Sequence, residues 1–150
     1  MFLSGMLARG RTRVKTRSLA ANVRWALAAG WMGLIFYLSH QTAPLGARPS
    51  AFESTLAHLA LYGALALLLS WALATAGGGR SGPAWALATV VFGLTVLYGV
   101  TDELHQAFVP GRQASQSDLA IDAAGAGLGI AAWLLWARLV EAVRARSSPN

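Results

Sequence analysis

One short segment carries many of the side chains in this sequence that could do chemistry. It reads Thr101-Asp102-Glu103-Leu104-His105-Gln106, followed shortly by Val109-Pro110-Gly111-Arg112. These residues offer carboxylates, an imidazole, an amide and a guanidinium, which can move protons, bind a metal ion or hold an anion. The segment ends a long apolar stretch, and an ionisable group at membrane depth costs several kcal/mol. We therefore expect a functional site here.

Further polar side chains lie at the ends of the other apolar stretches. They are His40 after the first stretch, Glu53 and His58 at the start of the second, and Asp118 and Asp122 at the start of the last. When consecutive helices alternate in direction, all of these groups share one end of the bundle. Scattered interfacial charge would instead populate both ends, so we expect one site to which several helices contribute.

Helical spacing places several of these groups on common faces. Residues three, four and seven positions apart share one side of a helix. The resulting stripes are Tyr98, Asp102 and His105; Ser54, His58 and Tyr62; and Asp118, Asp122, Gly125 and Gly129. Glycine at four-residue spacing allows close contact between membrane helices. The face that carries the acids of the last stretch is therefore expected to pack inward.

Several of these residues also have a structural explanation when each is taken alone. His58 can serve as a hydrogen-bond donor between helices, and Asp118 as an N-cap. Asp122 lies one turn inside its helix, where a carboxyl group must be paired or protonated. Arg112 lies in a Pro-Gly turn, where it is either solvated or neutralises the acids.

Four apolar stretches approach the roughly 20 residues that a membrane-spanning helix needs. They cover about 23–38, 56–76, 84–108 and 117–140. Gly77-Gly78-Gly79 ends the second stretch, and Pro110-Gly111 ends the third. Ser117 or Asp118 is the expected N-cap of the last stretch. Short loops favour an up-and-down arrangement. The sequence therefore predicts an all-α, four-helix transmembrane bundle over 23–141, between basic tails at 1–22 and 142–150.

Composition supports this fold class. Hydrophobic residues make up 55% of the chain and charged residues 12%, against about 25% charged in a typical soluble domain. The net charge of +6 comes largely from two runs, Arg9–Arg17 and Arg138–Arg146, rather than from one face. Anionic membrane lipids are therefore the expected partner, and nucleic acid is not. The absence of cysteine excludes disulfides, thiolate nucleophiles and cysteine-ligated metals.

The distribution of lysine and arginine residues predicts the orientation of the chain in the membrane. With four spans, both termini and the loop at 77–82 share the side that holds nearly all basic residues, and the other side holds only Arg48 and Arg112. The positive-inside rule then places both termini in the cytoplasm and the polar site outside it. A basic run before an apolar segment is also typical of a signal peptide. The aromatic residues of 23–38 and the lack of a small-x-small site favour a retained span.

A divalent metal site is one use of these groups. Zinc and manganese accept mixed nitrogen and oxygen ligands. Here these ligands would come from His58, His105, Asp102 and Asp122. No His-x-x-x-His or Glu-x-x-His pair occurs within one helix, so such a site needs ligands from several helices. Nothing around Ser115 resembles a nucleophile elbow, which disfavours a serine triad.

Several short motifs follow a known family pattern. They are Tyr98-Gly99-x-x-Asp102-Glu103-x-His105-Gln106, Phe108-Val109-Pro110-Gly111-Arg112, Ser115-x-x-Asp118, Gly125, His58-x-x-x-Tyr62 and Tyr37-Leu38-Ser39. At these residues, over about 36–129, the chain resembles the VanZ-like family of small multi-pass membrane proteins. The resemblance implies a bacterial cell-membrane protein and, from the founding member, a link to glycopeptide antibiotic resistance.

Two positions depart from the pattern of that family. Ser54-Thr55 stands where an Asp-Lys pair is frequent, and Asp122 stands where Asn is frequent. If the family lysine contributes to the site, its expected substitute in this chain is Arg48 or Arg112.

Three hypotheses for the function follow. In the first, the protein is an enzyme that acts on a lipid-linked or cell-envelope substrate and influences glycopeptide susceptibility. Its catalytic groups would be Asp102, Glu103, His105, His58 and Asp118, and its substrate-binding groups Tyr98, Gln106, Arg112, Asp122 and Tyr62. In the second, the same site binds or transports a lipid or drug without changing it. In the third, the polar groups form a hydrogen-bond latch that holds the helices together.

Overall fold

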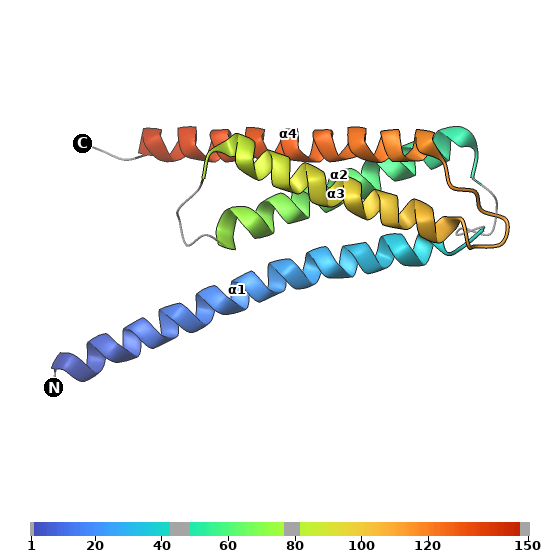
Figure 1. The fold of residues 1–150 in the computed structure, drawn as a ribbon. Coiled ribbons are helices and arrows are strands. Elements are labelled where there is room, and N and C mark those ends of the chain that lie inside the picture. Colours follow the sequence, from blue (N-terminus) through green and yellow to red (C-terminus); the bar gives the residue numbers. More distant parts are fainter. Residues whose placement is uncertain (1, 43–48, 77–81, 148–150) are drawn as a thin grey trace.

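The computed structural model describes residues 2–42, 49–76 and 82–147, with side chains from residue 19 onward. These residues form four helices and no strand: α1 (Phe2–Ser39), α2 (Ala51–Ala76), α3 (Ala84–Gln106) and α4 (Gln116–Ser147). Consecutive helices run in opposite directions, so both chain ends lie at one end of the bundle (Figure 1). The predicted all-α, up-and-down, four-helix architecture is confirmed.

All four helices are long and apolar enough to cross a membrane. The spans are Leu19–Ser39, Ala51–Thr75, Ala84–Gln106 and Gln116–Ser147. Large apolar side chains such as Leu97, Leu128 and Leu135 are mostly exposed on the bundle, as expected for a surface that faces lipid. The helices α1 and α4 also continue beyond the expected apolar stretches, into the basic segments at either terminus.

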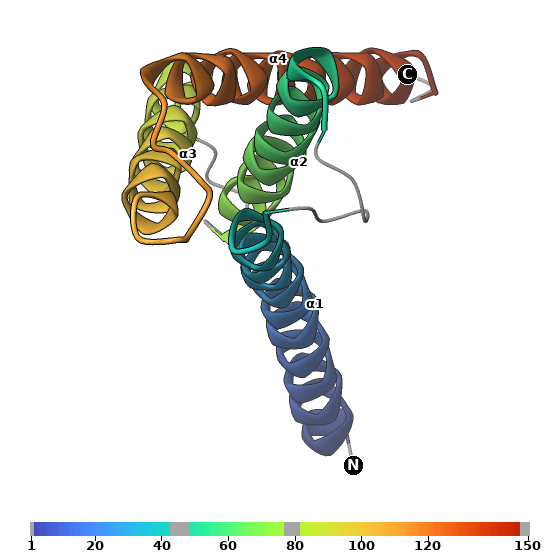
Figure 2. The ribbon, with the colours of Figure 1, turned by 90° about the vertical axis from the view of Figure 1, so that its right-hand side faces the viewer.

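Seen from the end opposite the termini, α2 lies between α4 and α1, with α3 alongside (Figure 2). The helix α2 contacts the other three, and α1 lies on the side away from α4. Buried apolar side chains fill the centre: Ala28 and Ile35 of α1; Tyr62, Leu65, Ala66 and Leu69 of α2; Val91 of α3; and Ala126 and Ile130 of α4.

The start of α2 is fixed by a capping box. The backbone N–H and the hydroxyl of Ser50 each donate to Glu53 Oε2 at 2.8 Å, and the Glu53 N–H donates to Ser50 Oγ at 3.3 Å. This reciprocal pairing satisfies N–H groups that have no partner within the helix. The helix α2 therefore begins at Ala51, ahead of the expected start at 56, and Glu53 serves as a cap.

The start of α4 differs from the prediction. The Ser115 hydroxyl accepts the Asp118 N–H at 3.2 Å, and the Ser115 carbonyl accepts the Leu119 N–H at 3.2 Å. Ser115 is therefore the N-cap, and neither Ser117 nor Asp118 takes that role. The prediction of Ser117 or Asp118 was wrong because the helix begins one residue earlier, at Gln116, and this leaves the Asp118 carboxylate free for other contacts.

Glycines bring α2 and α4 into backbone contact. A Cβ added at Gly125 would lie 2.7 Å from the Leu59 carbonyl oxygen and 3.2 Å from the Gly63 nitrogen. A Cβ at Gly129 would meet the Gly63 carbonyl oxygen directly. The expected inward packing of Gly125 and Gly129 is confirmed, and their partner on α2 is Gly63. This close approach places His58, next to Leu59, against the first turns of α4.

Candidate functional site

The candidate site residues come from the C-terminal ends of α1 and α3, the N-terminal parts of α2 and α4, and the α3–α4 loop. These parts of the chain lie at the end of the bundle opposite the termini (Figure 1). Their polar side chains form two clusters on different sides of α3. Neighbouring residues on a helix point about 100° apart, since each turn takes 3.6 residues. Asp102 and Glu103 therefore face different helices, and each belongs to a different cluster.

The Asp102 cluster consists of Ser39, Asp102, Gln106 and Arg112, and it joins α1 to α3. The buried Asp102 accepts hydrogen bonds at Oδ2 from the Ser39 hydroxyl at 2.8 Å and the Gln106 amide at 3.0 Å. Arg112 Nε donates to the Ser39 carbonyl at 3.2 Å. Asp102 Oδ1 has no hydrogen-bond partner among the described residues. These contacts hold the end of α1 against α3.

His105 and Tyr98 also face α1. The His105 ring stacks on Phe36, with centroids 4.3 Å apart, and its Nε2 lies 3.3 Å from His40 Nδ1. The Tyr98 hydroxyl donates to the Met32 carbonyl at 2.6 Å. The stripe expected on α3 therefore exists as one face that meets α1.

The His58 cluster consists of His58, Glu103, Asp118 and Asp122, and it joins α2, α3 and α4. His58 Nδ1 lies 2.8 Å from Asp122 Oδ1, and His58 Nε2 lies 4.0 Å from Asp118 Oδ2. Asp122 is fully buried, and its Oδ2 has no hydrogen-bond partner among the described residues. A Cβ at Gly99 would lie 3.2 Å from that oxygen, so the glycine leaves room for the carboxylate.

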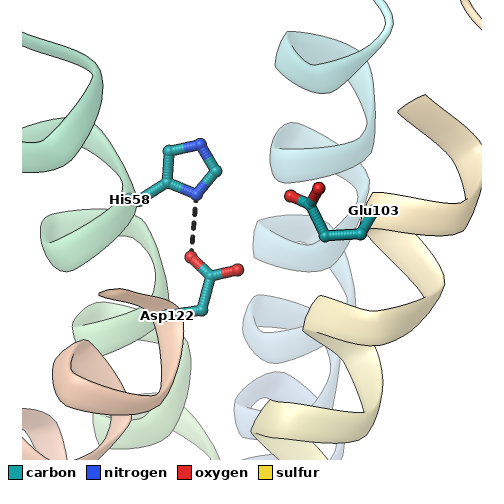
Figure 3. Close-up of side chains that lie close together, drawn as sticks. All are labelled: His58, Glu103 and Asp122. Carbon is teal, nitrogen blue, oxygen red and sulfur yellow. Dashed lines mark hydrogen bonds and ion pairs between the residues drawn. The ribbon is translucent and has the colours of Figure 1, made fainter. Parts of the chain in front are cut away.

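Glu103 approaches the His58–Asp122 pair from α3, and its carboxylate points toward the pair (Figure 3). Glu103 Oε2 accepts the Ser115 N–H at 2.6 Å, which ties α3 to the N-cap of α4. Its Oε1 is buried without a hydrogen-bond partner in the described part of the chain. One possible ligand atom each from His58, Glu103 and Asp122 lies within 4.8 Å of the other two.

The metal set expected from the sequence needs correction. The structure groups Glu103 with His58 and Asp122, whereas Asp102 and His105 face α1 and lie outside that group. Helical spacing gives the angle between residues on one helix, but it does not say which neighbour each face meets. For that reason the sequence could not separate Asp102 from Glu103.

Tyr62 lies between the two clusters. It is fully buried, and its ring is parallel to that of His58 with centroids 6.2 Å apart. On its other side, the Tyr98 ring centroid lies 6.4 Å away. The Tyr62 hydroxyl has no hydrogen-bond partner within 3.5 Å among the described residues, so Tyr62 packs between the clusters.

The His58 cluster contains more acidic than basic groups. In the described part of the chain, the contacts between a basic side chain and a carboxylate are both made by His58, whose imidazole carries a charge only when it is protonated. Arg112, a candidate to neutralise the acids, bonds a backbone carbonyl of α1, and Arg48 lies outside the described residues. An imidazole held by a carboxylate can move a proton, and the same donor set can bind a cation.

A cleft of about 290 Å³ opens beside Glu103. Polar lining comes from Glu103, Ser115 and Gln116, and apolar lining from Val100, Leu104, Ala114 and Leu119. The cleft therefore combines a carboxylate with apolar side chains.

Two residues at the site were not among the predicted site residues. Ser39 is the α1 partner of Asp102, and the Ser115 N–H is the partner of Glu103. Ser115-x-x-Asp118 has the form of an N-terminal capping box, a sequence signal that could have identified Ser115 as the cap. Ser39 ends the Tyr37-Leu38-Ser39 motif, but helical spacing does not say that its hydroxyl meets Asp102 of another helix.

A family model described as VanZ/LLP1 matches residues 24–137. The matched region extends from within α1 to within α4 and includes both polar clusters. No curated protein and no solved structure matches the chain.

Proposed function

The chain belongs to the VanZ/LLP1 family, and from this premise we propose that it acts in the bacterial cell membrane on a lipid-linked or cell-envelope substrate. The proposed site is the His58 cluster with the cleft beside Glu103. Acting on envelope material, the protein influences susceptibility to glycopeptide-type antibiotics.

The observation that carries this proposal is the environment of Glu103. Its side chain is only 7% exposed, one carboxylate oxygen lacks a hydrogen-bond partner among the described residues, and the residue lines the cleft. Burying a carboxylate without full pairing costs free energy, and the hydrogen bond that the Glu103 carboxylate accepts does not by itself offset this cost. A substrate with a polar headgroup and an apolar chain matches both kinds of lining.

The orientation of the site is part of the proposal. Arg24 of α1 lies against Trp71 near the end of α2, and Arg138, Arg144 and Arg146 lie in the C-terminal part of α4, whereas Arg112 follows α3 in the loop at the polar end. Under the positive-inside rule, the termini face the cytoplasm and the site faces outward. An outward site can reach lipid-linked precursors after they cross the membrane.

The two clusters have different proposed roles. His58, Glu103, Asp118 and Asp122 bind the headgroup and carry any chemistry, with Tyr62 beside them. Ser39, Asp102, Gln106 and Arg112, together with Tyr98 and His105, position α1. The hydrogen bonds between α1 and α3 support the latch hypothesis for this second group. Only the first group is assigned to the substrate.

Glu103→Gln tests the proposal, with Glu141→Gln as the matched control. Glu141 is exposed on α4 near the end that holds the termini, so the control makes the same chemical change away from the site. Each variant is expressed in a bacterial strain that lacks its own relatives, with membrane abundance measured by immunoblot. We expect the wild type and Glu141→Gln to shift the glycopeptide inhibitory concentration equally, and Glu103→Gln to lose that shift at equal abundance.

Mass spectrometry of lipids incubated with purified protein separates the remaining alternatives. A lipid whose mass is changed by the wild type and not by Glu103→Gln indicates an enzyme. A lipid that is retained with unchanged mass indicates binding or transport. Equal antibiotic susceptibility of wild type and Glu103→Gln at equal abundance would refute the assignment of Glu103 to the site.

A further inference from the structure

We propose that His58, Glu103 and Asp122 form a binding site for one divalent cation of the zinc or manganese type. Each ligand comes from a different helix: α2, α3 and α4 respectively (Figure 3). The existence of this site rests on the spacing, hydrogen bonding and charge of these side chains. Its role toward a substrate rests on the proposed function.

The first observation is the spacing of the three side chains. One ligand atom from each lies within 4.8 Å of the other two. Around zinc, bonds of about 2.0–2.2 Å in tetrahedral geometry place ligand atoms roughly 3.3–3.6 Å apart. Side-chain rotations that move an atom by about an ångström would therefore close the set around an ion.

The second observation is independent of spacing and concerns unpartnered oxygens. Asp122 is 0% exposed and Glu103 is 7% exposed, yet Asp122 Oδ2 and Glu103 Oε1 lack hydrogen-bond partners among the described residues. The Glu103 carboxylate points toward the His58–Asp122 pair (Figure 3). Buried polar atoms nearly always have a hydrogen-bond partner in native proteins. A cation between them would satisfy both oxygens at once.

The groups around the three ligands are arranged as the supporting groups of a metal site usually are. The Ser115 N–H donates to Glu103 Oε2. His58 Nδ1 lies 2.8 Å from Asp122 Oδ1, so this nitrogen would exchange its hydrogen bond for a bond to the ion. His58 Nε2 would then carry the ring proton and point it toward Asp118 Oδ2, 4.0 Å away. Groups of this kind fix the ligands in place and raise metal affinity.

Charge also favours a cation. The cluster places three carboxylates around one imidazole, and in the described part of the chain no lysine or arginine forms an ion pair with them. Buried charge without compensation is expensive in a membrane. One imidazole and two carboxylates form the nitrogen and oxygen set that zinc and manganese accept, with a coordination position left open. Because Glu103 also lines the cleft, that open position would be available to an oxygen of a substrate headgroup there.

The test is metal binding by purified protein in detergent. The protein is stripped with a chelator, dialysed against buffered Zn²⁺ or Mn²⁺, and its bound metal is counted by inductively coupled plasma mass spectrometry. We expect one ion per wild-type chain and a loss of affinity of about tenfold or more in Glu103→Gln and Asp122→Asn, since even supporting groups of metal sites contribute 10–100-fold. Glu141→Gln is expected to bind like the wild type.

A second control addresses His40 and His105. Their ring nitrogens lie 3.3 Å apart on the surface, so this pair could bind zinc adventitiously. The double variant His40→Gln/His105→Gln is expected to keep the bound ion. Absence of saturable binding in the wild type would overturn the proposal, and so would binding that survives Glu103→Gln and disappears in the double variant.

If Asp122→Asn fails to fold, Glu103→Gln still tests the cation site. Glu103→Gln keeps an amide oxygen that can accept the Ser115 N–H, so its fold should persist, and gel filtration in detergent checks this. Metal binding and antibiotic susceptibility are also separate readouts. A wild type without bound metal whose Glu103→Gln variant loses the susceptibility shift refutes the cation and leaves the proposed function standing. A wild type that binds one ion, with a Glu103→Gln variant that loses the ion and keeps the susceptibility shift, supports the cation site and refutes the proposed function.

Discussion

Replacing Gly125 by alanine should separate α2 from α4 and weaken the protein. The added Cβ would lie 2.7 Å from the Leu59 carbonyl oxygen, 0.7 Å short of the 3.4 Å at which ordinary van der Waals contact begins. Its other neighbours, the Gly63 nitrogen and Leu59 Cα, are at 3.2 Å and also belong to the backbone. No flexible side chain can move aside, so the helices themselves must shift.

Gly127→Ala isolates this steric effect. Gly127 lies on the same helix, is exposed, and has no atom within 4 Å of an added Cβ. Both substitutions gain the same helix propensity, roughly 0.5–1 kcal/mol. Overpacking of a tight contact costs about 1–3 kcal/mol. The difference in free energy of unfolding between the two variants is therefore expected to be about 1–3 kcal/mol, with Gly125→Ala the less stable.

Thermal unfolding of the purified variants in one detergent measures the difference. At about 2–4 °C per kcal/mol for a chain of this size, Gly125→Ala should unfold at least 2 °C below Gly127→Ala, and Gly127→Ala at or above the wild type. Gly125→Ala should also reduce metal binding, because the shifted Leu59 adjoins His58. An equal or higher unfolding temperature for Gly125→Ala would refute the packing explanation.

Two further predictions concern α1 and the orientation. Ser39→Ala should lower the free energy of unfolding by about 1–3 kcal/mol, since it removes one of two hydrogen bonds to the buried Asp102 carboxylate; a wild-type unfolding temperature would contradict this. Gln113→Cys places one thiol in the α3–α4 loop of a cysteine-free chain and leaves the Ser115 cap intact. An impermeant maleimide should label it in intact cells, with the wild type as the unlabelled control, and labelling only after lysis would show the opposite orientation.

Much of the fold could be predicted because its determinants are local. Apolar length predicts four spans, and glycine spacing predicts the inward face of α4 at Gly125 and Gly129. Gly63 was not predicted, since no second glycine follows it at four-residue spacing. The start of α2 was placed too late because apolar length alone ignores the Ser50–Glu53 capping box, although that box is visible in the sequence.

The site was only partly predictable because its contacts are not local. The sequence indicates that His58, Asp122 and the acids of α3 meet at one end of the bundle, and the structure brings them to that end. Tyr98, Asp102 and His105 also share one face of α3, as their spacing predicts. Choosing between Asp102 and Glu103 as the partner of His58 requires the rotation of α3 about its axis, and that rotation is set by the packing of all four helices.

The neighbouring acids of α3 also couple the two sides of that helix. Asp102 bonds α1 while Glu103 bonds the cap of α4, and both move with one helix. If a ligand draws Glu103 toward α4 and α3 moves as one body, the free energy with which α1 docks must change, and thermodynamic linkage makes that effect reciprocal. Because α1 continues to the opposite end of the bundle, ligand occupancy on one side of the membrane would be communicated to the helix that emerges on the other.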